Sequence, residues 1–271
     1  MGFGKPQPFV YAAGNFGEDV GGVFVVQSVG LINLEEKDCA RGRFRPKVAP
    51  VPARASKSPD FRFESELLNR GFTHIAGVDE AGRGPLAGPV VAAAVMLPVE
   101  WIMRGLPEGL QGMNDSKQLS AEAREDLYAG LICRPEIRFG IARVDAPLID
   151  RINILQASYR AMNLALAQLD PPPQHVLVDG LRVKTLEFPQ TPIVSGDALS
   201  CSIAAASILA KVTRDRLMVE FDREYPGYGF SGHKGYGTEA HLAALKERGP
   251  CPIHRHSFAP LRPAQGDLFA Q

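Results

Sequence analysis

Four acidic side chains have the chemistry of a metal site: Asp79, Glu80, Asp179 and Asp197. Asp79 and Glu80 follow the mostly apolar residues 74–78, so a buried strand would deliver two adjacent carboxylates, which are costly to bury without a cation. Hard divalent ions prefer such oxygen ligands. Two of these ions, held by a few shared carboxylates, can activate water and neutralise the charge that develops during phosphodiester hydrolysis. The acids therefore predict metal-assisted chemistry on a phosphodiester.

Each of these acids also has a structural interpretation. Asp179 precedes Gly180, a pair typical of turns, and Asp197 would make a good N-cap for the helix predicted after it. Adjacent residues of a strand point to opposite faces of the sheet. Glu80 would therefore join Asp79 at one site only if the chain bends directly after it.

A glycine-flanked arginine, Gly82-Arg83-Gly84, follows the acid pair. Its small neighbours would let a polyanionic backbone approach main-chain N–H groups, although a plain hairpin turn has the same composition. With Gly88 the pattern resembles a dinucleotide-binding fingerprint, but that fingerprint opens a helix, and here Pro89 and a β-rich run follow. The sequence contains neither a phosphate-binding P-loop motif nor a Gly-x-Ser-x-Gly elbow.

Residues 225–238 interleave aromatic, glycine and basic residues. Such a segment suits a ring packed against a sugar or base and a lysine against a phosphate, although an ordinary surface loop can have this composition. His233, His254 and His256 lack the ligand spacing expected on a helix. We interpret these histidines as surface residues or phosphate contacts and not as metal ligands.

The elements that must position these residues follow from the apolar periodicity. Strands are predicted at residues 74–79, 90–97, 137–144, 175–179 and 192–194, the first two as a hairpin. Helices are predicted at residues 120–131 with Ser120 as N-cap, at 152–169, after Asp197 with a buried first half at 203–210, and at 239–248. The order β-β-α-β-α-β-β-α predicts an α/β fold with a mixed five-stranded sheet flanked by helices.

The first 60 residues differ from the rest of the chain. Residues 41–62 contain seven basic residues, four prolines and one acid, Asp60, so we predict a disordered extension. It could be a solvated tail, an electrostatic arm for nucleic acid or the product of a misassigned start codon. We expect a single catalytic domain at residues 61–271, with residues 216–271 forming a C-terminal helix and loops that contact the substrate.

The composition excludes several classes of protein. The 271 residues carry no formal net charge and are 45% hydrophobic and 22% charged, which is ordinary for a globular protein and argues against a strongly basic coat protein. The four cysteines form no Cys-x-x-Cys pair, which favours free thiols in a reducing compartment over a zinc site. No apolar run approaches the ~20 residues that cross a bilayer. We therefore expect a cytoplasmic protein with no membrane contact.

The chain resembles the ribonuclease HII family from about residue 72 to residue 262. The family's opening signature is matched by residues 77–90, which include both the acid pair and Gly82-Arg83-Gly84. The other matching blocks follow in order and lie at residues 114–119, 154–162, 178–180, 196–197, 202–215, 228–238 and 255–260. Residues 1–60 lie outside the resemblance.

The resemblance implies a ribonuclease H-like fold with a small C-terminal helical segment. It implies endonucleolytic cleavage of the RNA strand of RNA–DNA hybrids and nicking on the 5′ side of single ribonucleotides embedded in duplex DNA, which leaves 3′-hydroxyl and 5′-phosphate ends. The cofactor it implies is Mg²⁺ or Mn²⁺, two ions per site, and all four family carboxylates are present. They map onto Asp79, Glu80, Asp179 and Asp197.

The resemblance also implies which residues contact the nucleic acid. Gly82, Arg83 and Gly84 would hold the ribonucleotide by its 2′-hydroxyl, the group that distinguishes RNA from DNA. Tyr236 would pack on the deoxyribose beside the junction. The candidate phosphate contacts are Arg83, Lys117, Lys211 and Lys234, of which Lys117 and Lys211 could equally be surface residues.

Three alternatives stay open. Another nuclease of the same fold, such as a junction resolvase or a ribonuclease HIII, would lack both the Gly-Arg-Gly and the Lys-Gly-Tyr blocks. A non-catalytic hybrid-binding module should have lost a carboxylate. A docking protein acting through residues 1–60 would lose its function when they are deleted.

We expect a monomer whose partners are RNA–DNA hybrid and ribonucleotide-containing duplex. Residues 265–269 are either a sliding-clamp peptide or a frayed terminus.

Overall fold

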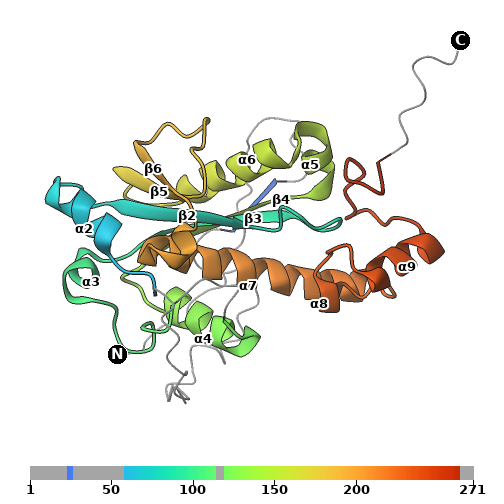
Figure 1. The fold of residues 1–271 in the computed structure, drawn as a ribbon, viewed down its shortest axis with the longest axis horizontal. Helices are drawn as coiled ribbons and strands as arrows, with labels where there is room; N and C mark the ends of the chain where they lie inside the picture. The colour runs from blue at the N-terminus through green and yellow to red at the C-terminus, as the bar shows by residue number, and fades with distance from the viewer. Residues whose placement is uncertain (1–22, 27–57, 114–118, 263–271) are drawn as a thin grey trace, which may run out of the picture.

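The computed structural model describes residues 23–26, 58–113 and 119–262 (Figure 1). Its centre is a six-stranded mixed sheet in the order β1-β4-β3-β2-β5-β6. The strands are β1 (Val23–Val26), β2 (Ile75–Ala81), β3 (Val90–Met96), β4 (Arg138–Val144), β5 (His175–Asp179) and β6 (Gln190–Ile193). The first four pair antiparallel where they touch, whereas β5 runs parallel to β2 and β6 runs parallel to β5. All five predicted strands are therefore present, and β2 and β3 form the predicted hairpin.

Helices cover both faces of this sheet (Figure 1). One face packs against α5 (Ala146–Ile152) and α6 (Ile154–Leu166), and the other packs against α4 (Ala121–Ile132) and the long α7 (Cys201–Glu224). The remaining helices of the described residues are α2 (Arg62–Asn69), α3 (Val99–Arg104), the 3₁₀ turn η1 (Gly196–Ala198), α8 (Phe230–His233) and α9 (Glu239–Arg248). None of the helices in these ranges has the length and apolar character needed to span a bilayer.

The alternating side chains of β3 divide the core into two layers. Val90, Ala92 and Ala94 pack towards α6, whereas Val91 and Ala93 pack towards α7 and α4. Both faces of this strand are therefore buried, as its continuous apolar run predicts.

Two glycines allow helices to approach the sheet closely. A Cβ on Gly77 of β2 would lie 2.3 Å from the backbone of Ser202, and a Cβ on Gly140 of β4 would lie 2.2 Å from the carbonyl oxygen of Ala165. The first 10 residues of α7 are all buried, as predicted for residues 203–210. α7 is thus pressed directly onto β2, the strand that carries Asp79 and Glu80.

Three features differ from the sequence-based expectations. β1 lies within residues 1–60 and adds a sixth strand beside β4, while the rest of that extension, apart from residues 58–60, lies outside the described residues. The helix predicted at 152–169 is α6, which begins at Ile154 because Asn153 has φ 66° and its side chain accepts a hydrogen bond from Gln156 N as the cap; Ile152 instead ends α5, a helix that was not predicted. Asp197 is not the N-cap of α7, since it lies in η1 and Ser200 caps the helix by accepting from Ile203 N. The predicted cap at Ser120 is confirmed by its hydrogen bond from Ala123 N.

The C-terminal part forms a second, smaller core beyond the end of the sheet (Figure 1). The far end of α7 contributes Met218, α8 contributes Phe230, α9 contributes Ala244, and the segment after α9 contributes Cys251. Ala87, from the connection between β2 and β3, packs into the same cluster. The C-terminal segment is thereby attached to the loop that follows Asp79 and Glu80.

Candidate active site

The sheet topology brings two of the predicted acids to one edge. β2 and β5 are parallel neighbours with Val78 opposite Val178, so Asp79 and Asp179 extend from the same end of the sheet. Each follows by two residues a position that faces α7: a Cβ on Gly77 would meet the backbone of Ser202, and Leu177 packs in one cluster with Ile203. Alternation along a strand therefore directs both carboxylates to the α7 face. This adjacency arises from residues 100 positions apart.

Asp197 reaches the same edge through a backbone hydrogen bond. The Oδ1 atom of Asp179 accepts from Gly196 N at 2.7 Å, which holds η1 against the end of β5. A Cβ on Gly196 would lie 2.6 Å from Ile203 Cδ1 and 3.3 Å from that Asp179 oxygen. Glycine is thus needed beside Asp197, whose own side chain is buried.

Glu80 lies on the opposite face of β2. The strand continues regularly through Ala81, and Asp79 pairs with Ala93 whereas Glu80 pairs with Ala92, so the bend that would turn both acids to one side is absent. Glu80 is nevertheless largely buried, and the charge of Asp179 acts on both acids. The three carboxylates therefore share one electrostatic environment at the end of the sheet.

Burial dominates the electrostatics of the acids. It raises the pKa of Asp79 well above its ordinary value, and the charges of Glu80 and Asp179 raise it further, against a hydrogen bond from Ser207. Burial also raises the pKa of Glu80, partly offset by Arg83, whose Nη1 lies 3.1 Å from Glu80 Oε1. Like charges packed away from water require a compensating cation.

The donor set fits a divalent metal ion. It consists of carboxylate oxygens, buried at Asp79 and Asp197 and partly buried at Glu80 and Asp179, and such hard ligands are those that Mg²⁺ and Mn²⁺ prefer. As placed, however, three of the four acids turn to a local partner: Asp79 Oδ1 to Glu80 N, Glu80 to Arg83, and Asp179 to Gly196 N. Accordingly no three His, Cys, Asp or Glu side chains of the described residues stand in metal-holding geometry. Ligation would require these carboxylates to turn away from their present hydrogen-bond partners.

The loop at residues 82–89, called the Gly-Arg-Gly loop below, brings Gly82, Arg83 and Gly84 beside these acids. Gly82 is buried with φ 96°, whereas Arg83 and Gly84 are exposed. A Cβ on Gly84 would lie 3.6 Å from Cε1 of Tyr236, and Leu86 N donates to Gly235 O at 2.8 Å. The two glycine-rich segments that the sequence singles out are therefore in contact. The Tyr236 side chain is 47% exposed, so its ring is accessible from solvent.

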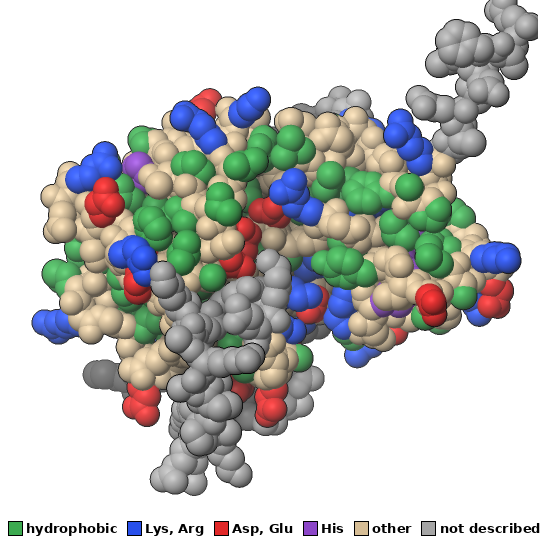
Figure 2. Space-filling model, viewed as in Figure 1, with side chains coloured by type: hydrophobic (Ala, Val, Ile, Leu, Met, Phe, Trp, Pro, Cys, Tyr) green, Lys and Arg blue, Asp and Glu red, His purple; other side chains and the backbone are tan. Residues whose placement is uncertain are grey.

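Acidic side chains gather in the middle of the face shown in Figure 2, with basic side chains beside them. An open groove of about 600 Å³ runs between α4, α7 and the segment after α8. Its charged lining residues are five basic ones and three acidic ones: Arg124, Lys211, Arg216, Arg223 and Lys234, and Glu125, Asp215 and Glu220. Such a lining suits a phosphate backbone.

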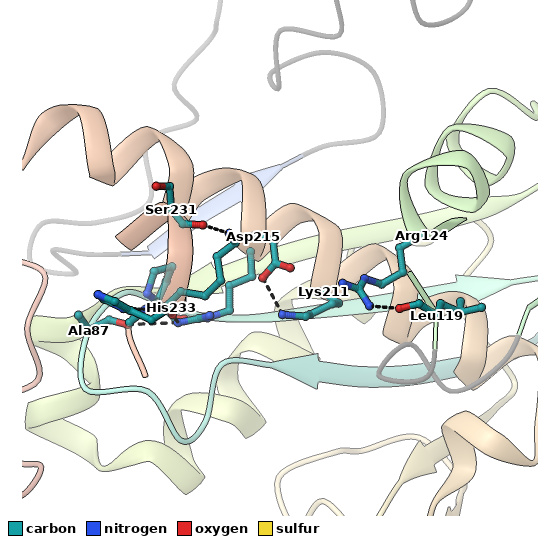
Figure 3. A network of polar contacts seen from close by, with 11 residues as sticks. Ala87, Leu119, Arg124, Lys211, Asp215, Ser231 and His233 are labelled. Atoms are coloured by element: carbon teal, nitrogen blue, oxygen red, sulfur yellow. Dashed lines mark hydrogen bonds and ion pairs between the residues drawn. The ribbon is translucent and has the colours of Figure 1, made fainter. Parts of the chain in front are cut away.

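The predicted lysines have different environments. Lys211 Nζ lies 2.7 Å from Asp215 Oδ1, four residues along α7, and Figure 3 shows the two side chains turned to each other with Arg124 nearby. Lys234 adopts φ 53° and its Nζ donates to Ser231 O. Both lysines line the groove, whereas Lys117 lies outside the described residues.

Several buried polar residues escape the sequence-based prediction. The prediction of a surface position for His254 is wrong: the ring is buried and hydrogen-bonded to His241, also buried. His233 is half-buried and His256 is exposed. Two fully buried arginines, Arg214 and Arg255, were also missed, although both lie within the blocks that resemble the family. The signal that could have indicated these buried arginines is the presence of a charged residue inside an otherwise apolar or structured block.

Comparisons with known proteins agree with this architecture. The sequence profile of the family described as Ribonuclease HII matches residues 76–261. The Ribonuclease HII of Ruminiclostridium cellulolyticum is 55% identical over 196 residues, covering 72% of this chain and 74% of that protein. The crystal structure of the ribonuclease H2 from Pyrococcus horikoshii OT3 has a TM-score of 0.58 and 30% identity, covering 69% of this chain and 95% of that one. A PCNA:RNase HII complex from Archaeoglobus fulgidus has a TM-score of 0.56 and 24% identity, covering 72% and 98%.

Proposed function

The chain belongs to the ribonuclease HII family of endonucleases that hydrolyse RNA in RNA–DNA hybrids, and we propose that Asp79, Glu80, Asp179 and Asp197 form the site at which it does so. The observation that carries this proposal is the parallel pairing of β2 with β5, which gathers carboxylates from distant parts of the chain at one edge. An ordinary turn or cap would explain each acid alone, but not their convergence. The chain also contains both the Gly-Arg-Gly and the Lys-Gly-Tyr blocks. A junction resolvase or a ribonuclease HIII would lack these two blocks, so their presence argues against both alternatives.

The four acids would hold two Mg²⁺ or Mn²⁺ ions. A divalent ion there supplies a water nucleophile at neutral pH and neutralises charge on the reacting phosphate. The chain itself holds the acids in place: β2 fixes Asp79 and Glu80, and the Gly196 amide keeps Asp179 next to η1. Ser207, on α7, hydrogen-bonds to Asp79 and orients that carboxylate.

The Gly-Arg-Gly loop and Tyr236 would recognise the junction between RNA and DNA. The backbone N–H groups of the exposed residues Arg83 and Gly84 have no hydrogen-bond partner among the described residues, so they can donate to a 2′-hydroxyl oxygen. Tyr236 stands against Gly84, where its ring would pack on the neighbouring deoxyribose. The groove lined by Lys211 and Lys234 would hold phosphates of the same duplex.

Four further expectations, on a clamp contact, a phosphate contact, the oligomeric state and the location in the cell, remain predictions. A clamp contact through residues 265–269 and a phosphate contact through Lys117 lie outside the described residues. Monomeric state and cytoplasmic location likewise stay predictions. Deleting residues 1–60 would also remove β1 from the sheet, so a role for the extension is tested by deleting residues 1–22, which an enzyme centred on Asp79 should survive.

The decisive experiment is cleavage of a DNA duplex that carries one ribonucleotide, beside the same duplex made only of DNA, with and without Mg²⁺ or Mn²⁺. We expect metal-dependent nicking on the 5′ side of the ribonucleotide and an intact control. Cleavage of both duplexes at equal rates would reject the proposed substrate, and full turnover by Asp79→Asn would reject the proposed site.

A further inference from the structure

Two arginines are buried beneath the Gly-Arg-Gly loop. Arg214, on α7, is 1% exposed, and Arg255, in the segment after α9, is 0% exposed. Within the described residues neither guanidinium forms an ion pair with a carboxylate, and all of their hydrogen bonds go to backbone carbonyl oxygens. A charged group without a counter-ion is rarely buried, because its desolvation is poorly offset.

Arg255 holds the beginning and the end of the Gly-Arg-Gly loop together. Its Nη2 donates to Gly82 O at 2.6 Å and to Gly88 O at 2.8 Å, its Nη1 donates to Arg83 O at 2.9 Å, and its Nε also donates to Gly88 O. One planar guanidinium thus gathers three carbonyls, two of which belong to the predicted 2′-hydroxyl contact. These carbonyls are turned into the protein, while Arg83 and Gly84 are themselves exposed.

Arg214 joins this loop to the segment that carries Tyr236. Its Nε donates to Pro89 O at 3.0 Å, and its Nη2 donates to Ala87 O at 3.2 Å and to Lys234 O at 3.1 Å. Lys234 lies two residues before Tyr236. This side chain, together with the hydrogen bond from Leu86 N to Gly235 O, therefore holds the Gly-Arg-Gly loop against the segment that carries Tyr236.

Glycines make room for this arrangement. A Cβ on Gly82 would lie 2.0 Å from Arg214 Nε, and a Cβ on Gly235 would lie 2.4 Å from Ala87 O. Burial lowers the pKa of Arg214 to about 10, and burial together with the charge of Arg214 lowers the pKa of Arg255 to about 9, so both remain cationic at neutral pH. Two like charges are thus kept close together at an energetic cost that packing alone does not explain.

We propose that Arg214 and Arg255 are positioning residues for ribonucleotide recognition, which hold the Gly-Arg-Gly loop and Tyr236 at the spacing needed to contact a 2′-hydroxyl and the adjacent deoxyribose together. This inference rests on the proposed function and deepens it. Lysine would keep the charge at either position, but its single ammonium group cannot span three carbonyls in a plane. An Arg→Lys substitution therefore keeps the positive charge and removes the planar set of hydrogen bonds, so it tests the geometry alone.

The test compares Arg214→Lys and Arg255→Lys with Arg134→Lys. Arg134 is a matched control, because it also donates to two backbone carbonyls, Gly130 O and Glu108 O, at a distance from the loop. Two quantities are measured for each protein: kcat/KM on a duplex with one ribonucleotide, and the inhibition constant of the same duplex made only of DNA. The all-DNA duplex reports general binding without the 2′-hydroxyl. Thermal melting reports the folded fraction.

We expect Arg214→Lys and Arg255→Lys each to lower kcat/KM by about tenfold or more, the effect of losing one to two hydrogen bonds from a charged group. The inhibition constant of the DNA duplex should stay at the wild-type value, as should both quantities in Arg134→Lys. Equal losses in kcat/KM and DNA binding, no loss at all, or failure of both variants to fold would assign these arginines a purely structural role and overturn the proposal. A wild-type protein that does not cleave the ribonucleotide duplex would instead reject the proposed function.

Discussion

His241 and His254 meet with their Nε2 atoms 3.0 Å apart beneath Tyr236. Cys251 N donates to His254 Nδ1 at 2.9 Å, so the proton of His254 is assigned to Nε2 and is donated to His241. His241 must then carry its proton on Nδ1, which lies 2.9 Å from Tyr236 O. Both rings are neutral in this arrangement, and together they fix the backbone carbonyl of the residue expected to contact the deoxyribose.

The neutral histidine pair predicts a loss of stability in acid. Burial lowers the pKa of His254 to about 4 and also lowers that of His241, and the neighbouring His233 and His256 act in the same direction on His254. A histidine whose pKa is lower in the native state binds fewer protons than in the unfolded state, where its pKa is about 6.5. We therefore expect stability to fall as the pH is lowered from about 6.5 towards 4.

Chemical unfolding measured across this pH range checks the prediction, with His254→Gln as the comparison. The variant lacks the titrating ring, so its free energy of unfolding should change less between pH 6.5 and 4 than that of the wild type. Parallel curves for the two proteins would contradict a role for His254.

Asp79→Asn should remove activity while stabilising the metal-free protein. The native pKa of Asp79 lies above its unfolded value, so the stabilising protonated form is lost as the pH rises, and the ionised carboxylate opposes folding at pH 7. An amide removes that charge. We expect a loss in kcat of at least about 10²–10³, the range for losing one preorganised group that stabilises transition-state charge. In EDTA the melting temperature should rise.

Metal addition provides the complementary measurement for this variant. Mn²⁺ should raise the melting temperature of the wild type through linkage, and it should do so less for Asp79→Asn. A variant that is less stable than the wild type in EDTA would show that Asp79 has a structural role that outweighs its buried charge.

Tyr236 should contribute its ring and not its hydroxyl. Tyr236→Ala removes the surface predicted to pack on deoxyribose, and we expect about a tenfold loss in kcat/KM, within the ~1–3 kcal/mol that one stacking contact contributes. Tyr236→Phe keeps the ring and should retain wild-type kinetics. Steady-state assays on the single-ribonucleotide duplex distinguish the two, and equal losses in both variants would point to the hydroxyl.

Glu64 should stabilise the start of α7. Its Oε1 accepts from Ser200 Oγ at 2.6 Å, from Ser202 Oγ at 2.6 Å and from Ser202 N at 3.0 Å, all in a buried environment. Glu64→Ala leaves these donors without that partner, and we expect the free energy of unfolding to fall by about 2–3 kcal/mol. Urea denaturation measures it. Glu66→Ala, exposed on the same helix, is the control and should change stability by less than about 0.5 kcal/mol.

Much of the fold follows from local patterns in the sequence. The apolar run at residues 90–97 predicts a strand buried on both faces, and β3 is such a strand. The predicted helix start at Ser120 and the buried first half of α7 depend likewise on residues within a few positions of one another. Both errors concern where a helix begins: Asn153, with a positive φ, starts α6 two residues later than predicted, and Ser200, not Asp197, caps α7. Neither helix start alters the spacing of the apolar residues, so the apolar periodicity could not have located it.

The sequence by itself determined the chemistry of this protein: which residues are acidic, where glycines flank an arginine, and that these blocks occur in the order typical of ribonuclease HII. Only the tertiary structure decided which of them meet. Asp179 lies beside Asp79 because β5 pairs in parallel with β2, and Arg255 reaches Arg83 across 172 positions of chain. Secondary structure depends on neighbours a few residues apart, whereas these contacts depend on strand pairing and on helix packing. Burial of His254, Arg214 and Arg255 likewise exists only once the C-terminal segment packs on the Gly-Arg-Gly loop.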